Sequence, residues 1–296
     1  GRKTSKNRFP MAPHMEIAGL TEKDKTILIC RLVMLVALLS LVLRWFSGAL
    51  PLQILPGPLF NLNLDFAYHT CHYFNLEHIL FGQHGIAALF TAALFLSCLT
   101  GLLRPQKTYP FIIYTILIIT YMIGYNLIIT HHSHQLALLS LATLPFFVKN
   151  VKNRILLIEG FRYYICFVYV VAFIFKLTGG SFFVWNNGVN SVKMNLVEYL
   201  YHFPDAIPAR IISFGIAHPW ILNTGHTLIL LLEGVMIIGF FTKRYDKWLI
   251  WLPIMVHLST YLFSDVLFVE MFVFIFFFLN DGQLKWIKQR MPILVK

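Results

Sequence analysis

The chain has 296 residues, of which 58% are hydrophobic and 16% are aromatic, whereas only 12% carry a charge. Soluble domains carry about 25% charged residues, so this composition excludes an ordinary soluble domain and predicts an integral membrane protein. The formal net charge is +11. The basic residues are spread between apolar segments instead of forming one patch, which argues against a nucleic-acid-binding protein.

The chain is expected to consist of three parts: a cytoplasmic tail over residues 1–25, a transmembrane domain over 26–280 and a basic cytoplasmic tail over 281–296. The first fifteen residues read as part of that tail or as a remnant of the expression vector. No cleavable signal peptide is expected, because the first apolar run is too long and lacks a small-residue cleavage site at its end.

About eight apolar stretches follow one another along the chain. Most of them approach the ~20 residues that a helix needs to cross ~30 Å of hydrocarbon. The sequence therefore predicts an all-α, polytopic membrane helix bundle of about eight transmembrane helices in the cell (inner) membrane. The stretches are 26–46, 82–103, 110–129, 135–148, 155–177, 223–241, 247–263 and 266–279.

Lys and Arg residues gather in alternate connecting segments. The basic segments are 2–25, 104–107, 149–154, 243–247 and 285–296, whereas 47–81, 130–133 and 264–265 contain neither residue. The positive-inside rule then places both termini in the cytoplasm. The excess positive charge is expected to face the anionic lipids of the inner leaflet.

Two longer loops, 47–81 and 178–222, are expected on the outer side and are too short to fold alone. Apolar residues at helical spacing over 191–202 predict a short interfacial helix that ends before Pro204. Both loops are expected to act as lids on the bundle. Cys30, Cys98 and Cys166 fall within predicted spans, which predicts unpaired thiols and no disulfide framework.

Of the twelve histidines, only His14 is expected in the cytoplasm, and most of the others fall at the outer side. Histidine is tolerated in the headgroup region, so a loop histidine needs no functional explanation. Within the spans, His226 and Glu233 are seven residues apart on one helix face. A carboxylate in the membrane costs a few kcal/mol unless it is protonated or paired.

His257 and Tyr261 share one stripe of the next span, at i and i+4, and Glu270 enters the last span near its outer end. We expect these groups to converge with His226 and Glu233 on an outward-opening cavity. The alternative is a buried polar network that only fixes helix packing.

Other charges within the spans are predicted to be structural. Glu159 and Arg162 are three residues apart and can pair locally. Arg31 and Arg44 lie near the two ends of the first span, where long side chains can extend to the membrane surface.

The His-His-Ser-His stretch at 131–134 could hold a metal ion. Carboxylates are not interleaved with these histidines at ligand spacing, so we expect no metal.

Lys176 ends an apolar run and is followed by Gly-Gly, two Phe and Trp-Asn-Asn-Gly. About twenty residues at ~1.5 Å each place it near the outer edge of the hydrocarbon. The amine there can extend to the headgroups. It can instead point into a dry cavity, where desolvation favours the neutral amine and makes it a usable base. Composition leaves both positions open.

Three segments resemble the vitamin K-dependent gamma-glutamyl carboxylase and its bacterial relatives with the horizontally transferred transmembrane (HTTM) domain. The first is AFIFKLTGGSFFVWNNG, in which Lys176, Leu177, Trp185 and Gly188 match a Lys-Leu followed by Trp-x-x-Gly. The second is NLIITHHSHQLALLSLATLPFF, in which His132 is the better match and His134 the second. The third is WLPIMVHLSTYLFSDVLFVEMFVF, which contains His257.

The resemblance implies that Lys176 is the base that deprotonates a reduced quinone of the vitamin K or menaquinol type. Oxygen would then convert the quinol to a strongly basic, epoxide-forming intermediate. This intermediate would remove a proton from a glutamate, which carbon dioxide would then carboxylate. His132 would be a polar partner near the reacting groups, and His257 occupies the family's histidine position. We expect Lys176 to face an outward cavity covered by Trp185, Asn186 and Asn187.

Little sequence follows the last predicted span, so we expect no counterpart of the animal enzyme's peptide-binding luminal domain, and the resemblance leaves the exported peptide or protein substrate undefined. An alternative function is a non-catalytic membrane partner or scaffold for the maturation or export of a secreted peptide or protein. A small DoxX-like quinone-handling protein fits less well, because such chains are about half as long. A transporter also fits less well, because no inverted repeat is present.

Overall fold

The computed structural model describes residues 20–54, 69, 73–128, 134–264 and 268–294. Within these residues every regular element is helical, which confirms the predicted all-α class. The elements are α1 (Glu22–Phe46), η1 (His78–Gly82), α3 (His84–Leu103), α4 (Tyr109–Ile128), α5 (His134–Thr143), η2 (Leu144–Phe147), α6 (Val151–Thr178), α7 (Asn187–His202), α8 (Ile207–Ala217), α9 (Pro219–Val235), α10 (Ile238–Phe241), α11 (Asp246–Leu249), α12 (Trp251–Ser264), η3 (Val269–Phe278), α13 (Asp281–Arg290) and η4 (Pro292–Leu294).

Each of the eight apolar stretches overlaps a helical element. Among the described residues, four helices are long and apolar enough to cross a membrane: Glu22–Phe46, His84–Leu103, Val151–Thr178 and Pro219–Phe241. The last stretch, expected as a span, is a 3₁₀ helix of 10 residues that packs against α1, α5, α6 and α12. At ~2.0 Å per residue, such a helix reaches only ~20 Å.

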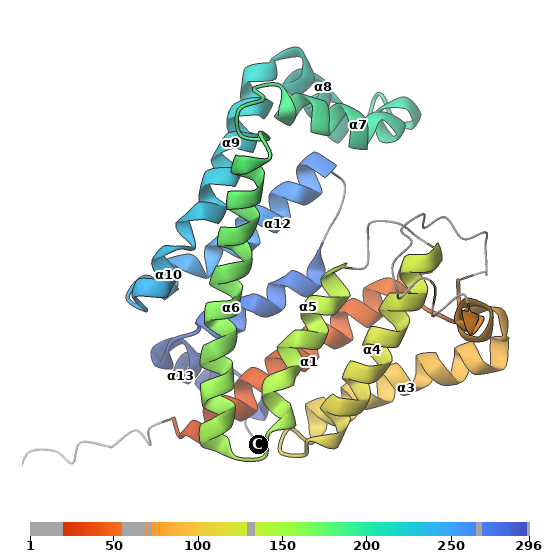
Figure 1. The fold of residues 1–296 in the computed structure, drawn as a ribbon, viewed down its shortest axis with the longest axis vertical. Coiled ribbons are helices and arrows are strands. Elements are labelled where there is room, and N and C mark those ends of the chain that lie inside the picture. The colour runs from red at the N-terminus through yellow and green to blue at the C-terminus, as the bar shows by residue number, and fades with distance from the viewer. Residues whose placement is uncertain (1–19, 55–68, 70–72, 129–133, 265–267, 295–296) are drawn as a thin grey trace, which may run out of the picture.

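Helix α1 lies at the centre of the bundle (Figure 1). It begins with a capping box, in which the side chains of Thr21 and Asp24 each accept from the backbone N–H of the other. Of its most apolar window, 72% is buried, against 22% for the helix at 219–241. Helices α3, η3, α6 and α5 cover α1. An apolar helix covered by protein on most sides is a core helix rather than a lipid-facing one.

The basic ends of several elements lie together at one end of the molecule. Lys288 of α13 pairs with Asp24 at 2.7 Å, and Lys25 pairs with Asp281 at 2.6 Å. Helix α13 therefore lies beside the start of α1 (Figure 1). Arg154, near the start of α6, donates to the Pro105 carbonyl at 3.3 Å, which attaches the loop between α3 and α4 to the same end.

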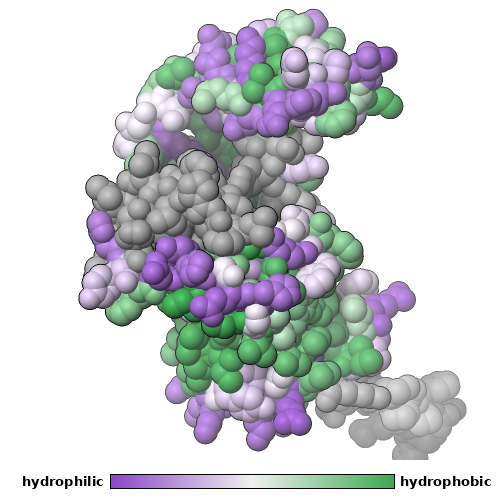
Figure 2. Space-filling view, turned by 90° about the vertical axis from the view of Figure 1, so that its right-hand side faces the viewer, coloured by the Kyte–Doolittle hydropathy of each residue, from purple (hydrophilic) through white to green (hydrophobic). Residues whose placement is uncertain are grey.

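Hydrophobic residues form a band on the face shown in Figure 2, with hydrophilic residues gathered below it and above it. Above the band stands the unit that contains α7 and α8. In Figure 1 these two helices lie across the top of α6 and α9. A hydrophobic band between two polar zones is the surface pattern of a protein embedded in a bilayer.

The charged residues of α6 that were predicted to be structural form ion pairs that their sequence spacing did not predict. The predicted local pair between Glu159 and Arg162 is wrong, because Arg162 binds Asp246 of α11 through two bonds of 2.5 and 2.8 Å. Glu159 pairs instead with Lys243. Both partners come from the segment that follows α10, so these ion pairs connect α6 to a distant part of the chain.

Arg31 was also expected to extend to the membrane surface, but it is buried in the first half of α1 and donates to the carbonyls of Leu102 and Ile293, at 3.0 and 3.1 Å. The three predicted free thiols, Cys30, Cys98 and Cys166, are buried and unpaired, as expected.

Candidate functional site

Helices α6 and α9 pack side by side (Figure 1). They approach closely at Gly234. A Cβ atom at Gly234 would lie 3.1 Å from the ring of Phe173 of α6. The missing side chain lets this ring pack against the backbone of α9. Glu233 precedes the glycine, and Lys176 lies three residues after Phe173. The close approach thus brings Lys176 and Glu233 within reach of each other.

Lys176 turns its amine toward α9 and forms a two-pronged ion pair with Glu233. The Lys176 Nζ atom lies 2.5 Å from Glu233 Oε1 and 2.7 Å from Glu233 Oε2. The carboxylate side chain is only 6% exposed, whereas the lysine side chain is 37% exposed. The environments of the two side chains therefore differ. The lysine side chain reaches the surface, whereas the buried glutamate needs the positive charge of the lysine to balance its own negative charge.

Tyr169 lies seven residues before Lys176, on the same face of α6. Its hydroxyl bonds to His257 Nε2 of α12 at 2.7 Å, and both side chains are buried. Phe268 and Phe274 surround this pair with aromatic rings. The structure therefore joins α6, α9 and α12 through two neighbouring polar contacts.

Two imidazole nitrogens in this region are buried and lack a hydrogen-bond partner, His226 Nε2 and His257 Nδ1. Both imidazoles interact electrostatically with the ammonium group of Lys176. A buried polar atom without a partner costs ~1–3 kcal/mol. We define Lys176, Glu233, Tyr169, His226 and His257 as the α6–α9–α12 cluster.

Glu270 belongs to a second buried cluster, a correction to its expected place with His226 and Glu233. Its Oε1 atom accepts from Ser40 at 2.6 Å and from the Nε and Nη2 atoms of Arg44, at 3.0 and 2.9 Å. Arg44 also donates to the Tyr121 hydroxyl at 3.4 Å. Arg44 was expected to extend to the membrane surface, but it is buried and connects α1 to η3.

The Trp-Asn-Asn-Gly turn, which was expected to cover a cavity at Lys176, attaches the start of α7 to α9. Asn223 of α9 accepts from the backbone N–H of Val189 at 3.0 Å and donates to Asn186 Oδ1 at 3.4 Å. Asn187 donates to the Ser181 carbonyl at 2.7 Å, within the turn itself.

Trp185 is 58% exposed, so the ring expected to cover Lys176 lies at the surface.

Gly188 sits where the start of α7 touches the backbone of α9, and a Cβ atom there would lie 2.3 Å from the Leu222 carbonyl oxygen. We expect Gly188→Ala to push α7 away from α9, because backbone atoms cannot yield as a side chain can. Overpacking costs ~1–3 kcal/mol or more. Thermal unfolding of the detergent-solubilised protein measures the loss. Gly160→Ala is the control, since its Cβ meets open space, and equal stability of the two variants would contradict the prediction.

Other candidate residues fall outside this cluster. His132 lies outside the described residues, and His134 begins α5. Tyr261 is 44% exposed, one turn beyond the buried His257. In the part of the chain that the structure describes, no group of three or more His, Cys, Asp or Glu side chains is arranged to hold a metal ion.

Sequence reasoning missed Tyr169 and the direct pairing of Lys176 with Glu233. A signal for each exists in the sequence. Tyr169 and Lys176 repeat at seven residues, as His226 and Glu233 do, so each pair shares one helix face. A deeply placed carboxylate also needs a cation, and Lys176 is a basic residue at the end of a neighbouring span.

Comparisons with protein-family models, with curated proteins and with solved structures find no match for this chain. The chemistry of the cluster therefore rests on its own residues. A buried Lys–Glu pair can exist as two ions or, after one proton moves from nitrogen to oxygen, as a neutral amine and a carboxylic acid. Only the second form leaves a nitrogen lone pair that accepts a proton.

Proposed function

We propose that the chain crosses the membrane about eight times, with both termini in the cytoplasm, and that the α6–α9–α12 cluster faces the outer side. The alternation of basic and non-basic loops supports this orientation. Cysteines introduced at Lys152 and Lys193 are expected to react differently with a membrane-impermeant reagent on intact cells. The cysteine at position 193 is labelled and that at 152 is not. Labelling of the cysteine at position 152 alone would show that the chain has the opposite orientation.

We further propose that this cluster removes a proton from a reduced quinone of the vitamin K or menaquinol type, in order to modify an exported peptide or protein. The Lys176–Glu233 pair beside two unpaired imidazole nitrogens carries this proposal. Because ionisable groups inside a membrane domain are costly, such a group is by default a reason to propose a functional site. The resemblance of the Lys-Leu and Trp-x-x-Gly segment to the carboxylase family supports the same class of substrate.

The residues of the cluster fit such a ligand. His226 Nε2 and His257 Nδ1 offer hydrogen-bonding sites for two ring oxygens. Phe268 and Phe274, packed around His257 and Tyr169, offer apolar surface for an aromatic ring. When bound, a reduced quinone supplies the acidic hydroxyl on which the cluster acts.

Lys176 and Glu233 divide the work of proton transfer in this proposal. Lys176 first passes one proton to Glu233, which leaves a neutral amine and a neutral acid. The amine then accepts the hydroxyl proton of the substrate, and no net charge is buried before that step. The Tyr169 hydroxyl bonds to the Nε2 atom of His257, so the Nδ1 atom of His257 lies on the opposite side of the ring from this bond. A general base of this kind contributes ~10²–10⁴-fold to a rate.

A photoreactive quinone analogue tests whether the cluster binds this ligand. We expect the analogue to label peptides of α6, α9 or α12 in the purified protein, and unlabelled menaquinone to suppress that labelling. The reason is that the unpaired nitrogens and aromatic rings all lie on these helices. Labelling confined to α3 and α4, or unaffected by menaquinone, would reject the quinone proposal.

A scaffold for an exported protein remains the second candidate, and one observation favours it. The α7 and α8 helices carry exposed apolar stripes at helical spacing on the unit that lies across α6 and α9. The stripes consist of Met194, Val197 and Tyr201 on α7 and of Ile207, Ile211 and Phe214 on α8. For a scaffold, charged substitutions on these stripes abolish function and substitutions at Lys176 do not.

A further inference from the structure

A pocket of about 210 Å³ lies at the basic end of the molecule, far along the helices from the α6–α9–α12 cluster. It opens between α1 and the loop that joins α3 to α4. Its lining residues are Ile27, Arg31, Leu103, Arg104, Pro105, Gln106 and Lys107. Three of these side chains are cationic, one is an amide and none is a carboxylate.

Arg31 forms the fixed wall of this pocket. It is 8% exposed, and its Nε and Nη1 atoms donate to the carbonyls of Leu102 and Ile293. These bonds hold the guanidinium in place and leave Nη2 without a protein partner among the described residues. Guanidinium groups bind phosphate oxygens with directed N–H bonds, and a pre-positioned guanidinium loses little entropy when it does so.

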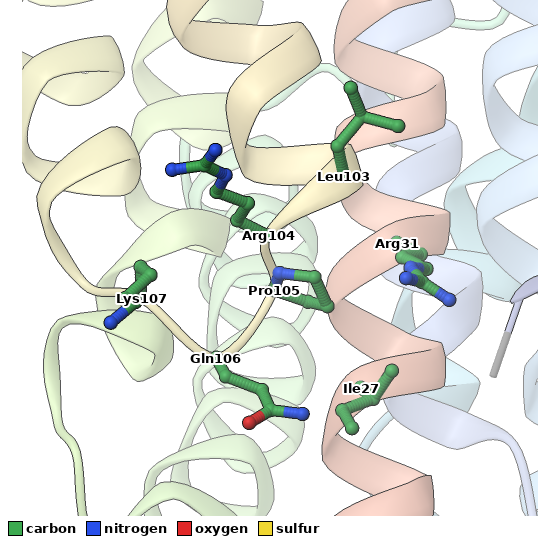
Figure 3. Close-up of a pocket in the computed structure, with 7 residues that line it drawn as sticks. All are labelled: Ile27, Arg31, Leu103, Arg104, Pro105, Gln106 and Lys107. Carbon is green, nitrogen blue, oxygen red and sulfur yellow. The ribbon is translucent and has the colours of Figure 1, made fainter. Parts of the chain in front are cut away.

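The loop opposite Arg31 carries the mobile charges of the pocket. Gln106 extends from the loop toward α1, whereas Arg104 and Lys107 extend from the side of the loop that faces away from α1 (Figure 3). Both cations are exposed, and exposed side chains change rotamer on a picosecond-to-nanosecond timescale. Arg154 holds the loop backbone through the Pro105 carbonyl. The loop therefore has a fixed backbone and cations that are free to turn toward a ligand.

Nearby carboxylates do not neutralise the pocket. Asp24 lies one turn before Ile27 on the same face of α1, and Lys288 pairs with it at 2.7 Å. Asp281 pairs with Lys25. Asp24 and Asp281 thus each pair with a lysine of their own, and no carboxylate lines the pocket, so the positive charge of Arg31, Arg104 and Lys107 stays available to an outside anion.

We propose that this pocket binds the phosphate-bearing headgroup of an anionic phospholipid. The apolar part of the lining favours a lipid over free phosphate: Ile27 lies at the pocket, and Leu103, at the end of the apolar helix α3, is 72% exposed. A headgroup phosphate held by Arg31, Arg104 and Lys107 leaves its acyl chains beside α1 and α3. Basic pockets between membrane helices on the cytoplasmic side bind headgroups of this kind.

Native mass spectrometry of the purified full-length chain tests the proposal, with phosphatidylglycerol and phosphatidylcholine as the two lipids. Each Lys or Arg near an anionic headgroup contributes about fivefold in affinity. The Arg104→Gln/Lys107→Gln double variant is therefore expected to bind phosphatidylglycerol about 25-fold more weakly. Its binding of phosphatidylcholine should be unchanged, and added salt should weaken only the anionic lipid.

The matched control is Lys149→Gln/Lys152→Gln, which removes two exposed cations at the same end but outside the pocket. It is expected to keep the affinity of the unsubstituted chain. Equal losses of phosphatidylglycerol affinity in the two double variants would show that the lipid is attracted by the general positive charge of this end, and would overturn the proposal. Inorganic phosphate and glycerol 3-phosphate, each in large excess, should not displace the lipid. Displacement by either would assign the pocket to a soluble phosphate instead.

Discussion

The Lys176→Arg variant is expected to reach the membrane at the level of the unsubstituted chain and to lose activity by about 10²- to 10⁴-fold. Arginine retains the positive charge and can pair with Glu233 through two bonds, so the contact between α6 and α9 survives. It cannot give up its proton under physiological conditions and therefore cannot act as a base. The measurement is quinol consumption by the purified variant, beside rescue of a strain that lacks the protein.

Lys193→Arg provides the matched control, because Lys193 is exposed on α7 and has no part in the cluster. This variant should retain full activity. If Lys176→Arg is also fully active, the lysine is only the structural partner of Glu233, and the scaffold function becomes the better proposal.

Lys176→Met is expected to lower the free energy of unfolding more than Glu233→Leu does. Without Lys176, a carboxylate that is 6% exposed loses its counter-ion. Breaking a buried pair from that side costs ~3–5 kcal/mol. Without Glu233, the lysine can turn to the surface, because it is already 37% exposed. The cost from that side is then near the ~0–1 kcal/mol of exposed ion pairs.

Unfolding in detergent measures both single variants and the Lys176→Met/Glu233→Leu double variant. The double variant should recover most of the stability lost by Lys176→Met, because no unpaired ion remains. It should stay inactive, since it has no base. Equal costs for the two single variants would show that the environments of the two residues do not differ in this way.

Hydropathy predicts the most apolar helical segments of this chain, but it predicts neither α8 and α13 nor the rotation of each helix about its own axis. The apolar stretches match helical elements because a helix satisfies its own backbone groups. Several of these helices are apolar on all sides, so the pattern gives no preferred face, and it cannot say which residues of α6 meet α9. Lys176 and Glu233 are 57 residues apart, and the packing of α6 against α9 brings them together.

Local spacing also predicted the wrong partners for buried charges. Glu159 and Arg162 suit an i, i+3 pair, yet Arg162 gains more from Asp246, because that carboxylate offers two bonds in a buried position. In the same way, the position of Arg44 near a helix end predicted an extended, surface-bound side chain. Its burial depends on Glu270, a residue of a separate element that sequence proximity does not reveal.

The pairing of Arg44 with Glu270 also sets a condition on how the chain is made. The two residues are 226 positions apart, so at ~5–20 residues per second the ribosome needs roughly 10 to 45 s to deliver the glutamate after the arginine. During that time the first helix holds a cation with no counter-ion. We expect a chain cut short before Glu270 to keep that charge without this counter-ion and to be more open to proteolysis at its first helix than the full chain. The synthesis of Glu270 is thus the step that supplies the counter-ion for Arg44 in the last turn of the first helix.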